Sequence, residues 1–387
     1  MERIYLNKAN INREDIKSVK QALNTNWVAT YGDQLFQSEK EIKKITNAKY
    51  VCLLNSGTSS LHLALKSYKF KKKSEVLVPS LTFISPVNSI IYCDLKPIFM
   101  DVNDDHNVNI KLLLNFLKTN TFRKNKKTYN KKTKKQIVAI IIVHMWGNIS
   151  NMISIKTICR KYNIKVIEDA AEALGSFLKI KNKKVHAGTF GDIGCLSFNG
   201  NKIVTGGNGG AIITNNQNTY KTVSHLAAQA KKDNIAFIHD DVGYNYKMSN
   251  LNASLLYSQL KKLKFFIKKK NYIRGIYFKG LKKSKFFSLV SHDNYKLNNN
   301  WLNILKLNNK KIKPRKLNKF LEGKNIETRM VWHPNHDQTM FKNYQKYKVT
   351  KSLQIPKYCL CLPSGTGLKL KEIKKVISSL IEYEKKI

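Results

Sequence analysis

LLNSGTSSLHLAL, residues 53 to 65, is the stretch that decides the fold. An apolar run ends at Leu54, a Ser-Gly-Thr turn follows, and apolar residues then recur with helical spacing from Leu61 to Tyr68. The turn therefore lies at a helix N-terminus, where unpaired N–H groups, the helix dipole and the hydroxyls of Thr58 and Ser59 suit a phosphate group. Serine and threonine are also good N-caps, so this turn alone leaves both interpretations open.

Around this stretch, short apolar runs alternate with helical patterns, which indicates an α/β fold with a mostly parallel sheet. Seven strands are expected, at Val51–Leu54, Val76–Val78, Pro97–Val102, Ile137–His144, Lys165–Glu168, Gly194–Phe198 and Gly210–Thr214. After Asn250 a long helical stretch begins and the pattern changes. We expect a large domain over residues 1–250 and a smaller C-terminal α/β domain over 251–387.

The chain of 387 residues carries a formal net charge of +45. Such an excess suits a nucleic-acid-binding protein, but it consists mainly of lysine accompanied by asparagine and isoleucine, as AT-rich codon usage would produce. We favour that origin, which makes nucleic acid an unlikely partner and leaves room for electrostatic steering of a phosphorylated ligand. The basic segment from Lys118 to Gln136 is expected to be a solvated surface insertion.

The six cysteines include one C-x-C pair and no paired C-x-x-C knuckles, so free thiols in a reducing cytoplasm are expected, and no metal site. The N-terminal residues lack the apolar core of a signal peptide, and no apolar run approaches the ~20 residues that span a membrane.

A second polar cluster is KVIEDAAEALG, residues 165 to 175, where an apolar strand carries Asp169 to its carboxyl end. Open α/β sheets bind ligands at that edge, so Asp169 suits a cationic ring nitrogen, and Glu172 one turn later faces the same ligand. A helix-capping role for Asp169 is an equal alternative.

A third cluster is CLSFNGNKIVTGGNGGAIIT, residues 195 to 214, in which Lys202 lies between a strand and a run of glycines. A partly desolvated lysine has a lowered pKa and forms imines. Most lysines of this chain are expected on the surface, so Lys202 alone does not indicate a functional residue. The order of the motifs does: the phosphate cradle, Phe83, Asp169 and Ser197 all precede Lys202. Together these are the requirements of pyridoxal phosphate.

Seven segments, in this order, resemble the DegT/DnrJ/EryC1/StrS sugar aminotransferases, which are pyridoxal phosphate enzymes of fold type I, the aspartate aminotransferase fold. The resemblance covers nearly the whole chain. The segments are NTNWVATYG (24–32), NSGTSSLHLAL (55–65), VPSLTFISPVNSI (78–90), HMWG (144–147), VIEDAAEALGS (166–176), GTFGDIGCLSFNGNKIVTGGNGG (188–210) and GYNYKMSNLNASLLYSQL (243–260).

The resemblance implies a role for each matched residue. Lys202 would bind the cofactor as an imine, Asp169 would pair with its ring nitrogen, and Phe83 would stack on its ring. The phosphate would be held by Gly57, Thr58, Ser59 and Ser197 and by Asn245 of a neighbouring subunit, which implies a homodimer with shared active sites.

Among the departures from the family pattern, two concern ligand contacts. Glu172 stands where many members have Gln or His beside the phenolic oxygen of the cofactor, and Lys247 stands where Arg is frequent, which weakens a bidentate grip on the donor's carboxylate. Lys202 itself argues against the dehydratase branch, which has histidine there.

The resemblance also implies the reaction, which moves an amino group from an amino acid such as L-glutamate to a keto-hexose of a nucleotide-linked sugar. The 4-keto position is expected, in the biosynthesis of a surface polysaccharide or nonulosonic acid. Five residues are expected in the substrate pocket: Trp27, Tyr31, His144, Arg329 and His333, each with packing or capping as an alternative. Two other functions stay open, a nucleic-acid-binding or regulatory protein on an inactive scaffold and an enzyme of the same fold acting on another substrate, such as an amino-cyclitol precursor.

Overall fold

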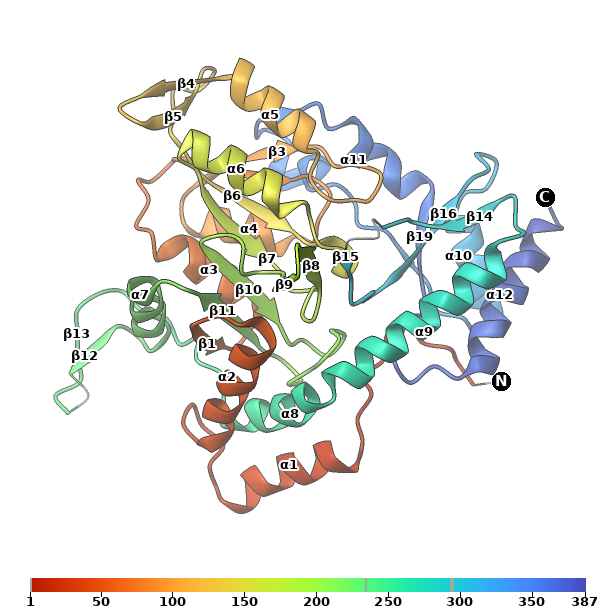
Figure 1. The fold of residues 1–387 in the computed structure, drawn as a ribbon, viewed down its shortest axis with the longest axis horizontal. Coiled ribbons are helices and arrows are strands. Elements are labelled where there is room, and N and C mark those ends of the chain that lie inside the picture. Colours follow the sequence, from red (N-terminus) through yellow and green to blue (C-terminus); the bar gives the residue numbers. More distant parts are fainter. Residues whose placement is uncertain (1, 234, 293–295) are drawn as a thin grey trace.

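The computed structural model describes residues 2–233, 235–292 and 296–387. Its centre is an eight-stranded sheet with helices on both faces, in the strand order β1-β11-β10-β7-β6-β2-β3-β18 (Figure 1). The expected α/β class and mostly parallel sheet are therefore confirmed.

All seven expected strands belong to this sheet, each within two residues of its expected ends. They are β1 (Tyr50–Leu54), β2 (Glu75–Pro79), β3 (Lys96–Met100), β6 (Ile137–Val143), β7 (Lys165–Asp169), β10 (Ile193–Ser197) and β11 (Gly210–Thr214). The eighth strand, β18 (Lys346–Tyr347), was not expected because two residues are too short to show a period. Strand β11 runs antiparallel to both of its neighbours, whereas the other pairs in the sheet are parallel.

Each strand of the sheet contributes alternate residues to two hydrophobic cores, because successive side chains point to opposite faces. In β1, Cys52 and Leu54 belong to one core, and Val51 and Leu53 to the other. The first core includes residues of α3 (Gly57–Lys66), α4 (Ser85–Tyr92) and α7 (Gln217–Ala227). The second includes residues of α2 (Asp33–Thr46), α5 (Ile110–Thr119), α6 (Met152–Tyr162) and α8 (Asn250–Lys261).

A third core lies beside the sheet, on the right in Figure 1, where both chain ends are also found. It joins α9 (Leu263–Leu281), α10 (Pro314–Gly323) and α12 (Leu370–Glu384) to a sheet of β14 (Phe287–Leu289), β16 (Asn303–Leu307), β19 (Cys359–Leu362) and β17 (Arg329–Met330). Ile4, from the start of the chain, is buried in this core too. The domain division at residue 250 stays a prediction.

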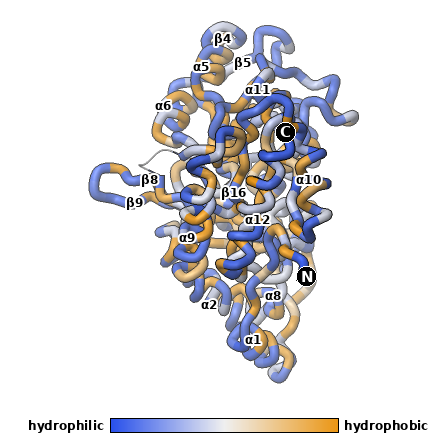
Figure 2. The backbone as a smooth tube through the Cα atoms, turned by 90° about the vertical axis from the view of Figure 1, so that its right-hand side faces the viewer, coloured by the Kyte–Doolittle hydropathy of each residue, from blue (hydrophilic) through white to orange (hydrophobic). Residues whose placement is uncertain are grey.

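The other elements are short or peripheral. Helix α1 (Arg13–Asn24) packs on α8, and α11 (Thr350–Gln354) follows β18. Three hairpins leave the body of the molecule: β4 (Thr121–Lys124) with β5 (Lys127–Asn130), β8 (Phe177–Ile180) with β9 (Lys183–His186), to which β15 (Lys296–Leu297) adds, and β12 (Lys231–Asp233) with β13 (Ile238–His239) (Figure 1). The hairpin β8–β9 projects from one side with a hydrophilic tip (Figure 2).

The basic segment from Lys118 to Gln136 is thus mostly the hairpin β4–β5, and its lysine side chains lie at the surface. Within the described ranges, no helix combines the length and apolar character needed to cross a membrane.

Candidate active site

A cavity of about 370 Å³ opens at the edge of the sheet where β1, β6, β7 and β10 end. The carboxyl ends of parallel strands meet at one edge, so residues far apart in sequence converge there. Eight of the predicted site residues line this cavity: Gly57, Thr58, Phe83, Asp169, Glu172, Ser197, Lys202 and Arg329. The C-terminal part of the chain contributes the facing wall through Trp301, Leu302, Met330 and Cys361.

One wall of the cavity is the N-terminus of α3. Ser56 caps the helix, since its hydroxyl accepts a hydrogen bond from the Ser59 N–H at 3.0 Å. The N–H groups of Gly57 and Thr58 have no partner within the helix, as in the first turn of any helix. A Cβ atom on Gly57 would lie 2.9 Å from the Cβ of Ser197, so only glycine lets the end of β10 approach this turn. The result is a polar concave surface at the positive end of a helix, which suits an anion.

The buried carboxylate at the end of β7 is Asp169. Its Oδ1 accepts a hydrogen bond from the Ala171 N–H at 3.0 Å. Burial raises the pKa of Asp169, and the Ala171 N–H and the positive charge of Lys202 act in the opposite direction. A buried carboxylate that is held by one backbone N–H is a place for a cationic partner.

Lys202 follows β10 and projects into the cavity with only 14% of its side chain exposed. Its Nζ lies 3.7 Å from Oε1 of Glu172 and 4.1 Å from the centroid of the Trp301 ring. Glu172 also accepts the Trp146 N–H at 2.6 Å through Oε2. Burial raises the pKa of Glu172 to about 7, although Lys202 and the Trp146 N–H both favour the charged form. Glu172 is therefore a carboxyl beside the Lys202 amine that gains or loses its proton near neutral pH.

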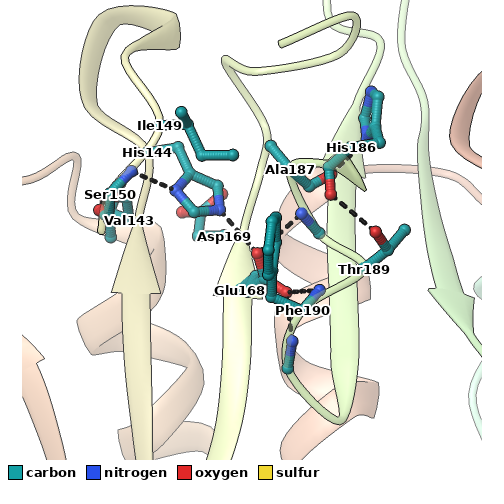
Figure 3. A network of polar contacts seen from close by, with 12 residues as sticks. Val143, His144, Ile149, Ser150, Glu168, Asp169, His186, Ala187, Thr189 and Phe190 are labelled. Atoms are coloured by element: carbon teal, nitrogen blue, oxygen red, sulfur yellow. Dashed lines mark hydrogen bonds and ion pairs between the residues drawn. The ribbon is translucent and has the colours of Figure 1, made fainter. Parts of the chain in front are cut away.

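Glu168, the residue before Asp169, is buried and joins neighbouring strand ends through hydrogen bonds (Figure 3). Its Oε2 lies 2.9 Å from His144 Nε2 and accepts the Gly188 N–H at 2.8 Å, while its Oε1 accepts the N–H of Phe190 at 2.7 Å. These contacts tie the end of β6 and the loop before β10 to β7. They hold the end of β7, and with it the backbone of Asp169, in a fixed position relative to the neighbouring strands.

Three tryptophans near the cavity were not among the predicted residues. The ring centroid of Trp146 lies 4.5 Å from the ring centroid of Trp332 and 6.2 Å from that of Trp301. All three residues line the cavity. Trp146 has a left-handed φ of 61° and is held by Glu172 and by His106, whose Nδ1 accepts the indole N–H at 2.8 Å. The sequence offered a signal for two of these tryptophans, because Trp146 lies in the HMWG segment and Trp332 lies three residues after Arg329. Trp301 lies in no matched segment, so the sequence offered no signal for it.

Two predicted residues on the cavity wall are partly exposed. Phe83 has 52% of its surface exposed, and its ring centroid lies 5.6 Å from that of Trp332. Arg329 projects its guanidinium next to Glu327, at 3.1 Å.

Six predicted residues lie outside this cavity. Ser59 donates its hydroxyl to Asn55, His144 is bonded to Glu168 below the site, and His333 lies at the surface 2.8 Å from Asp337. Asn245 is exposed, and its carbonyl accepts a hydrogen bond from Asn55. Trp27 and Tyr31 line a separate hollow with Gly32 and Asn250. Asn245, Trp27 and Tyr31 therefore do not reach the cavity of their own chain.

Lys247 also points away from the cavity. Its Nζ lies 4.0 Å from the Sγ of Cys52 in β1. Burial raises the pKa of Glu39, an effect that the Leu53 N–H and the charge of Lys247 only partly oppose.

The cavity fits pyridoxal phosphate on its own chemistry. It offers a helix N-terminus for the phosphate, Asp169 for the ring nitrogen and the primary amine of Lys202 for the aldehyde. Two buried polar atoms that line it, the Thr82 hydroxyl and Oδ1 of Asn201, have no hydrogen-bond partner among the described residues. Fold and site together define a cofactor-dependent transferase.

The model of the DegT/DnrJ/EryC1/StrS aminotransferase family matches residues 9–381, and the chain belongs to this family. It is 30% identical over 384 residues to the GDP-perosamine synthase of Escherichia coli O157:H7, with 99% of each chain covered. The expected aminotransferase class is therefore confirmed.

Solved structures of aminotransferases share the fold of this chain. PseC of Helicobacter pylori, an aminotransferase involved in the biosynthesis of pseudoaminic acid, has a TM-score of 0.89 at 20% identity, with all of both chains covered. The PLP form of Spr1654 from Streptococcus pneumoniae has a TM-score of 0.87 at 19% identity, covering 100% of this chain and 99% of its own. Pyridoxal phosphate is the cofactor of this family, as expected from the sequence.

Proposed function

We propose that this protein transfers an amino group from L-glutamate to the 4-keto group of a UDP- or GDP-linked hexose. The observation that carries the proposal is the meeting of Lys202, Asp169 and the α3 N-terminus in one cavity, beside Arg329 and three tryptophans. A site for the cofactor alone would not need Arg329 and the tryptophans, so we assign this part of the cavity lining to the sugar substrate. The GDP-perosamine synthase and PseC relatives support a nucleotide-linked substrate and a place in surface polysaccharide or nonulosonic acid biosynthesis.

Each residue has a proposed role. The N–H groups of Gly57 and Thr58, with the Ser197 hydroxyl, bind the phosphate of the cofactor, and Asp169 holds a proton on its ring nitrogen. Phe83 covers one face of the ring. Bound in this way, pyridoxal phosphate supplies an electron sink for the bond that breaks at the amino carbon.

Lys202 is the proposed proton carrier. Its Nζ, once free, would remove the proton from the amino carbon of the donor and return it on the other side of the amino nitrogen, so that one amine serves first as base and then as acid. Glu172, 3.7 Å from that Nζ, accepts or supplies the proton between these steps. Burial of both side chains excludes water and strengthens their interaction.

We further propose that the enzyme works as a cytoplasmic homodimer in which Asn245 of one subunit reaches the phosphate site of the other. Its exposed position, away from the cavity of its own chain, supports this arrangement. The six free cysteines support a reducing compartment.

The reaction is tested by incubating the protein with pyridoxal phosphate, L-glutamate and a UDP- or GDP-linked 4-keto hexose. Mass spectrometry should show an amino sugar and 2-oxoglutarate in equal amounts. Lys202→Ala and the corresponding 4-hydroxy sugar are the controls, and neither should give product. Transfer to a keto-cyclitol but to neither nucleotide sugar would instead support the alternative substrate class.

A further inference from the structure

Helix α9 carries a lysine, Lys270, that is only 1% exposed although its helix neighbours Lys268 and Lys269 are not buried. Phe266, Ile273 and Tyr277 share its face, with spacings of three and four residues that place them against the interior. Burial lowers the pKa of Lys270 to about 7. Burying an amine is costly, so its surroundings must compensate.

The surroundings of Lys270 are three oxygen atoms from three distant segments. Its Nζ donates to Oδ1 of Asn7 at 2.9 Å, to the Trp301 carbonyl at 2.7 Å and to the Ser364 carbonyl at 2.6 Å. No carboxylate is among these partners. Lys270 therefore joins the N-terminal segment, the approach to β16 and the turn after β19 at a single atom.

Two of these partners, Asn7 and Trp301, also form hydrogen bonds with the loop of residues 199–204, which carries Lys202. The side-chain amide of Asn7 donates to the Asn201 carbonyl, and the indole N–H of Trp301 donates to the same carbonyl at 2.7 Å. Asn201 directly precedes Lys202. Lys270, Asn7, Asn201 and Trp301 thus form a closed ring of hydrogen bonds that includes the carbonyl of the residue directly before Lys202.

Trp301 also contacts the reacting amine itself. The Lys202 Nζ lies 4.1 Å from the centroid of its ring, a distance typical of a cation–π contact. The backbone N–H of Trp301 donates to Oδ1 of Asn299 at 2.9 Å, and its backbone carbonyl accepts from Lys270. Both backbone polar groups of Trp301 are therefore hydrogen-bonded. The position of the indole is therefore set by Lys270 on one side and Asn299 on the other.

We propose that Lys270 is a positioning residue of the aminotransferase reaction, which acts through Asn7 and Trp301 to hold the backbone and the amine of Lys202 in place. This inference rests on the proposed function, in which Lys202 is the reacting group. A small displacement of a reacting group is costly, since about 1 Å lowers the rate about a hundredfold.

A purely structural role for Lys270 is the competing explanation, and the same helix face offers a matched control. Tyr277 is fully buried two turns further along, and its hydroxyl donates to the Pro363 carbonyl at 2.9 Å. Tyr277→Phe therefore removes a buried hydrogen bond between α9 and the turn after β19, and leaves the ring around Asn201 intact.

The test compares Lys270→Met, Asn7→Ala and Tyr277→Phe by steady-state kinetics and by hydrogen exchange of the 199–204 loop, with and without pyridoxal phosphate. Lys270→Met should lower kcat about 10- to 100-fold with little change in KM, the pattern of a group that acts in the transition state. Its loop amides should exchange about tenfold faster. Asn7→Ala should change both readouts in the same direction, and the double variant should lose less than the product of the two single effects.

The proposal is overturned if a folded Lys270→Met protein keeps the loop exchange and kcat of the wild type, or if Tyr277→Phe changes both as much as Lys270→Met does. Should Lys270→Met not fold, Asn7→Ala decides, because Asn7 is only half-buried. In that case unchanged loop exchange in Asn7→Ala counts against the proposal. Failure of the proposed function has a different signature, because wild-type protein would then show no turnover while loop exchange would still be measurable.

Discussion

At the scale of single residues, the surroundings of Lys202 distinguish it from the many lysines of this chain. The sequence could select it, because a lysine between a strand and a run of glycines follows a phosphate cradle and a strand-end aspartate. The sequence could not predict its contacts with Glu172 and Trp301, which come from other segments. These contacts depend on the end of β7 and the approach to β16 meeting in space, and no local pattern encodes that meeting.

The buried Glu172 carboxyl gives a pH dependence of stability. Its folded-state pKa of about 7 lies above the ordinary value of 4.5, so the folded protein binds more protons than the unfolded chain between these values. Its contribution to the free energy of unfolding is therefore present below pH 4.5 and is lost as the pH rises through 7, by about 3 kcal/mol at most.

Glu172→Gln should remove that contribution. Denaturant unfolding of the cofactor-free protein between pH 5 and 8 would measure it. The free energy of unfolding of the wild type minus that of the variant should fall as the pH rises. The exposed Glu14→Gln is the control and should give a flat difference. A flat or rising difference for Glu172→Gln would contradict the assigned burial of this group.

At the scale of elements, the seven long strands and the turn before α3 were predictable because each has a local signal of period or composition. The hairpins and β18 were not, since their strands have only two to four residues and show no period. The partner of β18, β3, also lies far away in sequence. The same limit applies to the site. Asp169, Lys202 and the turn before α3 were found at strand ends, whereas Trp301 came from a segment without any motif.

The close approach of α3 to β10 can be tested with Gly57→Ala. The added Cβ would meet the Ser197 side chain, with 2.9 Å to Cβ and 3.2 Å to Oγ, in the surface proposed to hold the phosphate. Overpacking of this kind costs about 1–3 kcal/mol, so the Kd for pyridoxal phosphate should rise about 10- to 100-fold. Absorbance titration would measure it.

The control for Gly57→Ala is Gly323→Ala in α10, where an added Cβ meets no atom within 4 Å. Cofactor affinity should not change in that variant. Wild-type affinity in Gly57→Ala would mean that the phosphate is held elsewhere.

At the scale of the whole molecule, the exposed aromatic residues need an explanation. Trp27 and Tyr31 are 54% and 73% exposed, with their ring centroids 5.5 Å apart, and they lie outside the cavity of their own chain. Exposed aromatic pairs are typical of interfaces. The resemblance predicted a place in the substrate pocket for both residues. A role at the proposed subunit interface could not be predicted, because an interface leaves no periodic signal in one sequence.

The shared active site can be tested by mixing subunits. Lys202→Ala and Asn245→Ala should each be inactive or nearly so as separate dimers. After unfolding and refolding together in equal amounts, half of the dimers should be mixed, and each should contain one intact site, which restores about a quarter of wild-type activity. Activity equal to the mean of the two variants would contradict an active site shared between subunits.

The central claim is that Lys202 is the amine that binds the cofactor, and borohydride reduction followed by peptide mapping tests it most directly. The protein is incubated with pyridoxal phosphate, reduced, digested and analysed by mass spectrometry. We predict one phosphopyridoxyl group per chain, on the peptide that contains Lys202. A modification centred on any other lysine, or spread evenly over the surface lysines, would contradict the account.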